Sequence, residues 1–558
     1  MRFPKKDNII ILLIFLIISL IWVTAASVRD VEDLNSDQQY VLTHAVKHLK
    51  PDLYQKDLLY QHDVADSYIP LYLNYLGFAY KTTGNLNAGY KFFVFPLNFI
   101  YLIGAYLLFK EIINKKWLPV ILAVVSSMPL SVPIAGEYFG IGPIQMITAR
   151  TVFTAFFPFV ALMFYKWIDM PPRLFIVFFI IGLLSNIHPP SGLFLTEIFI
   201  LVLLFYKPFN LKNIAYVCGY GVVMLAGAIY FVIAQLKTAD IVNVPQGSLN
   251  EIFKTGISYL FYPFHTLTFI PQQMLHIITA VLIISPLIFI VLFRLKRENK
   301  LTVKLFIALN IVMLLYILAS EIKNYLVLIT ILIIFSESFI WDRKTRLWTY
   351  FGIAAFMVGI GGVLAGQYIF SALNLSSLFG NQIRATRFLG FYVYLLFALV
   401  LRGVDIKALK PYKKAVLTLL VVLVVFSSLR HTYRTYIRYK PSVNTEMAQM
   451  AKWANENTAK DTVFMTDSLT FRLVSERAVF VCKKDGPAFY YSYPHLAEEW
   501  VKRLGEISTA KKSSQDLVTL AKRYDIHYVI LSDKGMLNDY DVLYKTEHLA
   551  LVNIDSKL

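Results

Sequence analysis

Long apolar runs separated by short polar segments make up most of this chain. The stretches 9–22, 174–184 and 415–426 contain no charged residue. A helix needs about 20 mostly apolar residues to cross the roughly 30 Å hydrocarbon core of a bilayer. The pattern therefore predicts an α-helical polytopic membrane protein with about 13 transmembrane helices. The predicted spans are 8–26, 91–109, 117–135, 148–166, 173–187, 190–206, 213–234, 272–294, 303–320, 324–341, 347–370, 386–402 and 415–429.

Basic residues occur in every second segment between these predicted spans. They begin with Arg2 ahead of the first span and recur, for example, at Lys207 and Lys212. Because cytoplasmic loops are enriched in Lys and Arg, the alternation predicts a cytoplasmic N-terminus. It also puts the first long loop, 27–90, and the whole tail after the last span on the opposite side of the membrane.

Two segments on that far side are too long to be simple connections. The chain is accordingly divided into a transmembrane domain, 1–429, and a C-terminal domain outside the cytoplasm, 430–558. Within the first, an aromatic and amphipathic segment, 236–271, is predicted to lie in the membrane interface. The second alternates short helical and β-prone runs, which predicts a small α/β domain. Helices are expected at 446–456, 496–504 and 517–524, and strands at 462–465, 478–482 and 527–531.

The composition is consistent with a membrane protein and argues against other classes of protein. Hydrophobic residues make up 57% of the 558 positions and charged residues 16%, whereas soluble proteins average about 45–50% and about 25%. The net charge of +18 would suit nucleic acid on a soluble protein. Here the basic residues lie in loops that set topology, so no nucleic-acid partner is expected. Two cysteines, Cys218 and Cys482, form neither a disulfide framework nor a cysteine metal site.

Carboxylates are concentrated in the loop that follows the first span. Asp33 and Asp37 lie just outside that span, Asp57 lies further on, and Glu137 lies in the next outer loop. A helix is predicted to begin near Ser36 or Asp37, because Asn, Ser and Asp favour a helix N-terminus. A carboxylate beside apolar spans can have a raised pKa, which suits a catalytic base. The alternative is a solvated acidic loop whose carboxylates only cap helices.

Cationic residues on the same side of the membrane are candidates for binding a lipid phosphate or a sugar. Arg150 begins one span, Arg384 and Arg387 begin another, and Arg472 lies in the tail. Arginine matches the oxygens of a phosphate, although snorkelling, headgroup contact or a scaffold role would also explain these residues. His188 occupies a tight Ile-His-Pro-Pro turn, and broken helices at membrane depth commonly line a cavity. A structural histidine is the alternative there.

Three of these residues also suit a divalent metal. Asp37, Asp57 and His188 are the candidate ligands, because carboxylates, with carbonyl and water oxygens, suit Mg²⁺ or Mn²⁺. The sequence requires no cofactor, and a divalent cation stays an open alternative.

The architecture resembles that of the C-type glycosyltransferases, the GT-C superfamily, which includes protein O-mannosyltransferases and oligosaccharyltransferases. Members have many spans, a large first outer loop with an acidic residue soon after span one, and often a C-terminal domain outside. The chain also resembles bacterial polytopic membrane proteins of this type. The stretches that carry this resemblance to the bacterial proteins are 36–51 together with Asp57, 148–151, 187–189 and 471–477.

This resemblance implies roles for individual residues. It assigns the first-loop acid to Asp37, with Asp33 next, and a second acid to Asp57 or Glu137. The phosphate-binding arginine would be one of the two that begin the twelfth span. The chain lacks the adjacent Asp-Glu pair of the mannosyltransferases and the Trp-Trp-Asp motif of the oligosaccharyltransferases. The second absence argues against oligosaccharyltransferase activity.

These features together predict a membrane glycosyltransferase of a bacterial inner or plasma membrane. It would move a sugar from a polyprenyl-phosphate donor to a glycan, lipid or protein acceptor outside the cytoplasm. Asp37 would take the acceptor proton, and arginines would hold the lipid phosphate. Two other functions stay open: a lipid or polysaccharide transporter or flippase, and a non-catalytic assembly factor for envelope polysaccharide.

Overall fold

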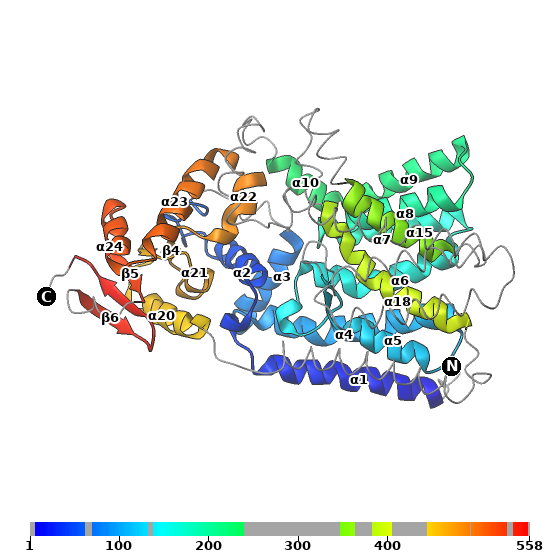
Figure 1. The fold of residues 1–558 in the computed structure, drawn as a ribbon, viewed down its shortest axis with the longest axis horizontal. Helices are drawn as coiled ribbons and strands as arrows, with labels where there is room; N and C mark the ends of the chain where they lie inside the picture. Colours follow the sequence, from blue (N-terminus) through cyan, green and yellow to red (C-terminus); the bar gives the residue numbers. More distant parts are fainter. Residues whose placement is uncertain are drawn as a thin grey trace, which may run out of the picture.

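The computed structural model describes most of the N-terminal half, two later helical segments and nearly all of the C-terminal region. The described ranges are 6–61, 70–131, 138–238, 346–362, 382–403, 443–491, 493–532 and 540–555. A bundle of apolar helices forms one end of the molecule and a small α/β domain forms the other (Figure 1). The predicted combination of a helical body and a C-terminal α/β region is confirmed in these residues.

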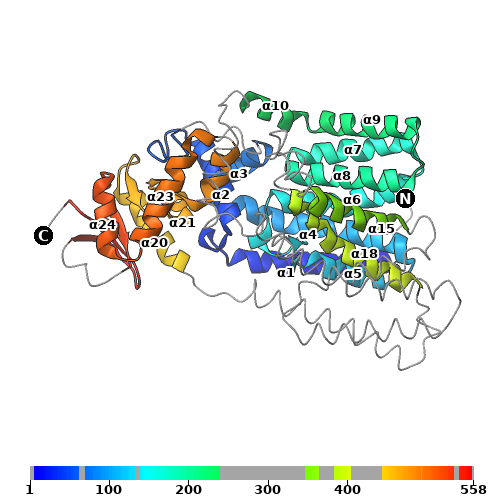
Figure 2. The same cartoon turned by 45° about the horizontal axis from the view of Figure 1, so that its top comes forward.

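Helices of the bundle run side by side in both ribbon views (Figures 1 and 2). They are α1 (Lys6–Ser27), α4 (Ala88–Ile113), α5 (Leu118–Ser127), α6 (Ala149–Trp167), α7 (Pro171–Ser185), α8 (Pro189–Tyr206), α9 (Leu211–Gly227), α10 (Ile229–Thr238), α15 (Arg346–Phe356) and α18 (Arg387–Gly403). Among the described residues, α1, α4 and α8 are long and apolar enough to cross a membrane. The spans predicted at 272–294, 303–320, 324–341 and 415–429, and residues 239–271 of the interfacial segment, lie outside the described residues.

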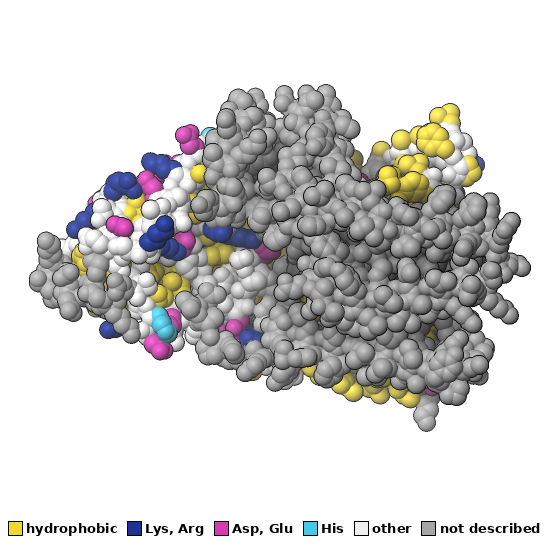
Figure 3. Space-filling view, in the orientation of Figure 1, with side chains coloured by type: hydrophobic (Ala, Val, Ile, Leu, Met, Phe, Trp, Pro, Cys, Tyr) yellow, Lys and Arg dark blue, Asp and Glu magenta, His cyan; other side chains and the backbone are white. Residues whose placement is uncertain are grey.

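Apolar side chains cover the outward faces of several bundle helices. On α1, Ile17 and Ile21 are 56% and 55% exposed, and on α9, Leu211 and Val222 are 83% and 67% exposed. In Figure 3 the charged side chains lie mainly over the C-terminal domain, while the described part of the bundle surface is largely apolar. Large exposed apolar surfaces mark contact with lipid or another protein. The bundle is therefore built as a membrane protein.

Helices α7 and α9 pack almost backbone to backbone. A Cβ atom added at Gly182 would lie 2.1 Å from the Met224 carbonyl oxygen, and one at Gly227 would lie 2.5 Å from that of Phe179. Small residues allow this close approach between membrane helices. Helix α9 ends at its C-cap residue Ala228, and α10 begins at the next residue, so the span predicted at 213–234 consists of two helices.

The span predicted at 117–135 is wrong at its C-terminal end. Helix α5 ends at Ser127, and Pro129 follows, a residue that disfavours helix in the position before it. The chain then forms the strand β1 (Leu130–Ser131), which pairs antiparallel with β2 (Tyr138–Phe139). This part of the chain returns toward the start of α6 instead of continuing as a helix.

The segment after α1 folds into short helices between the bundle and the C-terminal domain (Figure 1). These helices are η1 (Val31–Asp33), α2 (Ser36–Leu49) and α3 (Pro70–Thr83). Asn35 caps α2: its side chain accepts the Gln38 backbone N–H at 2.9 Å, and the Gln38 side chain accepts the Asn35 N–H at 3.0 Å. This reciprocal capping box confirms the predicted helix start near Ser36.

The C-terminal domain is a mixed sheet with helices packed on it. The strand order is β4-β3-β5-β7-β6, with β3 parallel to β4 and β5, and β7 antiparallel to β5 and β6. The strands are β3 (Val463–Met465), β4 (Ala478–Val479), β5 (Tyr528–Leu531), β6 (Asp541–Lys545) and β7 (Ala550–Asn553). The main helices are α20 (Val443–Asn457), α21 (Leu469–Ser475), α23 (Ala497–Ala510) and α24 (Ser514–Arg523). Three predicted helices and two predicted strands are confirmed, and the strand predicted at 478–482 is shorter than expected.

Candidate functional site

Asp37 lies in the first turn of α2, and its neighbour Gln38 fixes where that turn sits. Gln38 Nε2 donates to the carbonyl oxygens of Ile144 at 2.7 Å and Ile147 at 2.8 Å. Both acceptors lie just before α6, around the 3-10 turn η3 (Ile144–Met146). A buried side chain that satisfies two backbone carbonyls is a specific tether. It holds Asp37 beside the N-terminal end of α6.

The C-terminal domain contributes a cation to the same place. Lys484, in the 3-10 turn η10 (Lys483–Asp485), forms an ion pair with the Asp37 carboxylate. The Asp37 side chain is 51% exposed and that of Lys484 is 21% exposed, so solvent or a ligand can reach the pair.

Three arginines lie at the starts of helices near this pair. Arg150 is in the first turn of α6, Arg384 lies in η8 (Gln382–Thr386), and Arg387 is the first residue of α18. The charges of Arg150 and Arg384 act on both Asp37 and His188, and the charge of Arg387 acts on His188. Residues that are far apart in the sequence are thus brought into one electrostatic environment.

His188 joins the end of α7 to the start of α8 and caps α8. Its Nδ1 accepts the Ser191 backbone N–H at 3.2 Å and lies 2.8 Å from Ser191 Oγ. Burial, and then the charges of Arg387 and the other two arginines, hold the pKa of His188 well below its usual range. The ring is therefore neutral, with its proton on Nε2. Arg387 is buried over the same helix, its guanidinium 5.8 Å from the Phe194 ring centre.

We name this group the Asp37 cluster: Asp37, Arg150, His188, Arg384, Arg387 and Lys484. The surrounding protein partly desolvates the half-exposed Asp37 carboxyl and so raises its pKa, but the ammonium of Lys484 and the charges of Arg150 and Arg384 outweigh this effect, so the pKa lies below its ordinary value. Lys484, Arg150 and Arg384 thus act on the carboxylate, and the three arginines act on the neutral imidazole. The N-terminal ends of α2, α6, α8 and α18 add partial positive charge. Such an arrangement binds anions, phosphate above all.

A second charged group is buried where the C-terminal domain meets the segment after α1. Arg472 of α21 is fully buried and donates to the two oxygens of Asp485 at 2.8 and 2.7 Å. Its Nη1 also lies 3.5 Å from Asp57 Oδ2, and its guanidinium lies 5.0 Å from the Tyr60 ring centre. We name these four residues the Arg472 clamp: Arg472, Asp485, Asp57 and Tyr60.

Asp57 is held by this clamp and by backbone donors. It is 1% exposed, its Oδ1 accepts the Leu59 N–H at 3.1 Å, and its Oδ2 accepts the Val479 N–H at 3.4 Å. These contacts favour a structural role for Asp57, and they favour the scaffold alternative for Arg472. The sequence placed both among the candidate site residues.

Asp33 also makes local structural contacts. Its Oδ2 accepts the Asp30 N–H at 3.1 Å within the capping box of η1, and its Oδ1 lies 3.5 Å from Arg29 Nη1. It thus acts as a helix cap, the alternative that the sequence left open. Glu137 lies outside the described residues.

The predicted metal ligands do not form a metal site in the described part of the chain. The three residues Asp37, Asp57 and His188 are not gathered, since the one group of three metal-type ligands found there is Glu446, Glu547 and His548. Asp57 is occupied by Arg472 and backbone donors, and the cations around Asp37 would repel a metal ion. The residues therefore do not fit the divalent cation that the sequence allowed.

Lys484 is the site residue that the sequence did not single out. It lies in the short run Lys483-Lys484-Asp485-Gly486-Pro487 of the C-terminal domain. Nothing in that run connects it with Asp37, because the pair joins residues from opposite ends of the chain.

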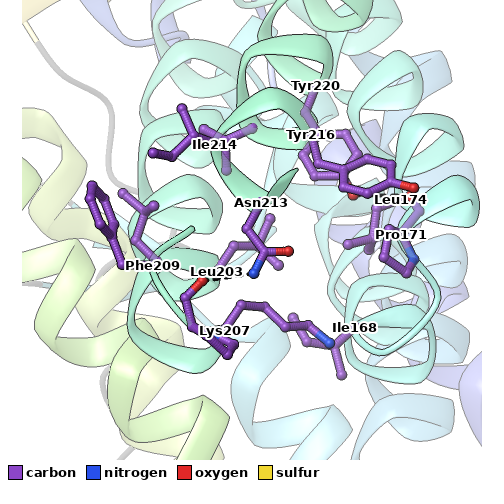
Figure 4. A pocket seen from close by; sticks show the side chains of 13 residues that line it. Ile168, Pro171, Leu174, Leu203, Lys207, Phe209, Asn213, Ile214, Tyr216 and Tyr220 are labelled. Carbon is purple, nitrogen blue, oxygen red and sulfur yellow. Dashed lines mark hydrogen bonds between the residues drawn. The ribbon is translucent and has the colours of Figure 1, made fainter. Parts of the chain in front are cut away.

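An apolar pocket lies away from this cluster, between α7, α8 and α9 (Figure 4). Its lining includes Pro171 at the start of α7 and Lys207 just after the end of α8, with Tyr216 and Tyr220 of α9. His188 joins the opposite ends of α7 and α8. The pocket is therefore separated from the Asp37 cluster by the length of these helices and is not part of it.

Comparison with known proteins adds one local similarity. Residues 445–507 are similar to DUF6798, a domain of unknown function. That range contains Arg472, Lys484 and Asp485, the residues through which the C-terminal domain reaches Asp37 and Asp57. No curated protein matches the chain in sequence.

Proposed function

We propose that this protein is a GT-C-type membrane glycosyltransferase whose Asp37 cluster binds the phosphate of a polyprenyl-phosphate sugar. The observation that carries the proposal is that three cations, Lys484, Arg150 and Arg384, act on Asp37 next to a bundle whose helices expose apolar side chains. Ionisable residues beside a membrane usually mark a functional site. Arginine and lysine side chains bind phosphate oxygens, and a lipid phosphate can reach them while its chain stays in the bilayer.

The chemistry of transfer assigns a role to each part of the cluster. An acceptor hydroxyl oxygen attacks the anomeric carbon of the sugar, and the bond between that carbon and the phosphate oxygen breaks. Asp37 takes the hydroxyl proton as general base. The lipid phosphate leaves with the electron pair of the broken bond, and arginine side chains stabilise its charge. Neutral His188 is able to donate a hydrogen bond from Nε2 to the sugar or the phosphate.

The proposal includes the topology indicated by the basic loops. Thirteen spans with a cytoplasmic N-terminus put Asp37 and the C-terminal domain on the far side of the membrane. A polyprenyl-phosphate sugar would then be used where secreted or surface acceptors are available.

A transporter of lipid-linked sugars would also need a cationic phosphate site, but it would not need a base. An assembly factor would need neither. The position of a carboxylate among the cations therefore favours transfer over both alternatives.

Reconstitution tests the proposal. The purified full chain is placed in proteoliposomes with a panel of polyprenyl-phosphate sugars, and released polyprenyl phosphate is measured. We expect release by the wild type and a raised KM for donor in Arg384→Met, with Lys212→Met, at an exposed position in the first turn of α9, as the control. No release from any donor would contradict the proposal, and movement of labelled lipid across the bilayer without release would support a flippase.

A further inference from the structure

Adjacent residues of η10 connect the two charged groups described above. Lys484 pairs with Asp37 in the Asp37 cluster, and Asp485 binds Arg472 with both carboxylate oxygens in the Arg472 clamp. A shift of this three-residue turn would therefore disturb both groups together. The position of Lys484 depends on the clamp beside it.

The clamp is built to resist such a shift. Arg472 and Asp485 come from the C-terminal domain, whereas Asp57 and Tyr60 come from the segment after α1. All four residues are at most 2% exposed. Buried charges that are paired on both sides strongly favour one geometry, because separating them leaves an unpaired charge in a dry environment.

Further contacts fix the position of the C-terminal domain against the segment after α1. Thr470 Oγ1 donates to Gln39 Oε1 at 3.0 Å, in a buried hydrogen bond. Lys50 forms an ion pair with Glu476, and the Tyr80 hydroxyl donates to the same carboxylate at 3.1 Å. The C-terminal domain is thus attached at several points along α2 and α3. This attachment puts η10 next to the N-terminal end of α2.

We propose that Lys484 is a substrate-binding residue supplied by the C-terminal domain, which binds the lipid phosphate together with Arg150 and Arg384, and that Asp485 and Arg472 position it. This inference rests on the proposed phosphate site and gives the region similar to DUF6798 a role in that site. The geometry that supports it is the direct ion pair with Asp37 and the partial exposure of both side chains.

Binding of the phosphate would change the state of Asp37. Lys484 is the partner that lowers the pKa of Asp37 most, and burial acts in the opposite direction. When Lys484 and the arginines turn to the phosphate, their lowering effect on Asp37 weakens, and the negative phosphate beside the carboxylate raises its pKa. The carboxylate then becomes a stronger base once the donor is bound.

Binding measurements on the full chain in lipid nanodiscs test the assignment without requiring turnover. Two probes are used: polyprenyl phosphate, which represents the lipid, and inorganic pyrophosphate, which represents a soluble anion. Lys484→Met should raise the Kd for polyprenyl phosphate about 10- to 100-fold, the range for loss of one charge-assisted hydrogen bond. Lys483→Met, at the adjacent exposed position, should change it less than about 2-fold, and Lys484→Arg should restore most of the affinity.

A positioning role for Asp485 is tested by its effect on binding and on turnover. Asp485→Asn should raise the KM for donor more than it lowers kcat, while Lys50→Met, which breaks a different contact of the same interface, should leave KM unchanged. If Asp485→Asn fails to fold, Asp485→Glu, which retains the charge with a longer side chain, provides the same comparison.

The outcomes separate this inference from the proposed transfer. Lys484-dependent binding of polyprenyl phosphate without turnover of any sugar donor would support the inference and contradict transfer. Turnover and binding that are both unchanged in Lys484→Met would overturn the inference alone. Tight binding of pyrophosphate but not of the lipid would overturn the lipid assignment, and no binding of either probe would overturn the phosphate site itself.

Discussion

Lys484 of the C-terminal domain forms an ion pair with Asp37, the second residue of helix α2. The pair connects the segment that follows the first span to a domain that begins after the last described bundle helix. The C-terminal α/β domain therefore does more than cover the helices of the bundle, because it supplies one of the charged side chains of the candidate site.

The Arg472 clamp should contribute strongly to stability. Arg472→Met leaves two buried carboxylates without their partner, so we expect a loss of about 3–5 kcal/mol in the free energy of unfolding. Denaturant unfolding of the purified chain measures it. The double variant Arg472→Met with Asp485→Leu should recover part of this loss, because it removes charges of both signs together. A single variant as stable as the wild type would contradict the role of the clamp.

Acid should destabilise the protein through His44, which is buried against Tyr40 and Tyr60. Burial and the charge of Arg472 lower the pKa of His44 to about 3, whereas an unfolded histidine titrates near pH 6.5. The unfolded chain therefore takes up a proton that the folded chain does not. The free energy that neutral His44 contributes to stability is fully present above about pH 6.5. It is lost by about 1.4 kcal/mol per pH unit as the pH falls from about 6.5 toward 3.

Replacing that ring should flatten the pH dependence. Melting temperatures between pH 7.5 and pH 5 should fall less steeply for His44→Phe than for the wild type. His48→Gln, at an exposed position on the same helix, is the control and should retain the wild-type slope. Equal slopes in all three proteins would show that His44 does not account for the acid sensitivity.

Two glycine substitutions in the bundle should have opposite effects. Gly182→Ala puts a methyl group against the Met224 carbonyl, so α7 and α9 must separate, at a cost of about 1–3 kcal/mol. At Gly221 of α9 a Cβ has no neighbour within 4 Å, and Gly221→Ala should stabilise the helix by up to about 1 kcal/mol. Thermal melting of both variants measures the difference, and equal effects would contradict the close packing of α7 and α9.

Topology can be tested with single cysteines. In a background with Cys218→Ser and Cys482→Ser, we expect Asp52→Cys to react with a membrane-impermeant maleimide added to intact cells. Lys212→Cys should react only after the cells are opened, because basic loops stay in the cytoplasm. Both positions are exposed. Labelling of residue 212 in intact cells would contradict the predicted orientation.

Local signals in the sequence predicted much of the fold. The Asn35–Gln38 capping box is contained in four consecutive residues, and the helix start near Ser36 followed from such preferences. The long apolar runs of α1, α4 and α8 were equally clear. The early end of α5 was missed because apolar residues continue beyond Pro129, where composition alone cannot separate helix from strand.

The site was predicted in part, for a physical reason. Arg150 and Arg384 stood out because each charge lies at the end of an apolar run, and His188 stood out because it occupies a tight turn before two prolines. The structure brings Arg150 and Arg384 close enough to act on both Asp37 and His188. Asp57 was predicted to be a site residue but makes structural contacts, whereas Lys484 was not predicted and lies in the site. Their partners are hundreds of residues away, and burial of an ion pair depends on tertiary packing that no local pattern encodes.

The most direct test of the account is the effect of Asp37→Asn on release of polyprenyl phosphate from a sugar donor. The amide keeps the shape of the side chain but cannot take the acceptor proton. We predict that kcat falls about 100- to 10,000-fold, with donor binding retained and Asp52→Asn at the wild-type rate. Release by Asp37→Asn at the wild-type rate would contradict the role of Asp37 as the base.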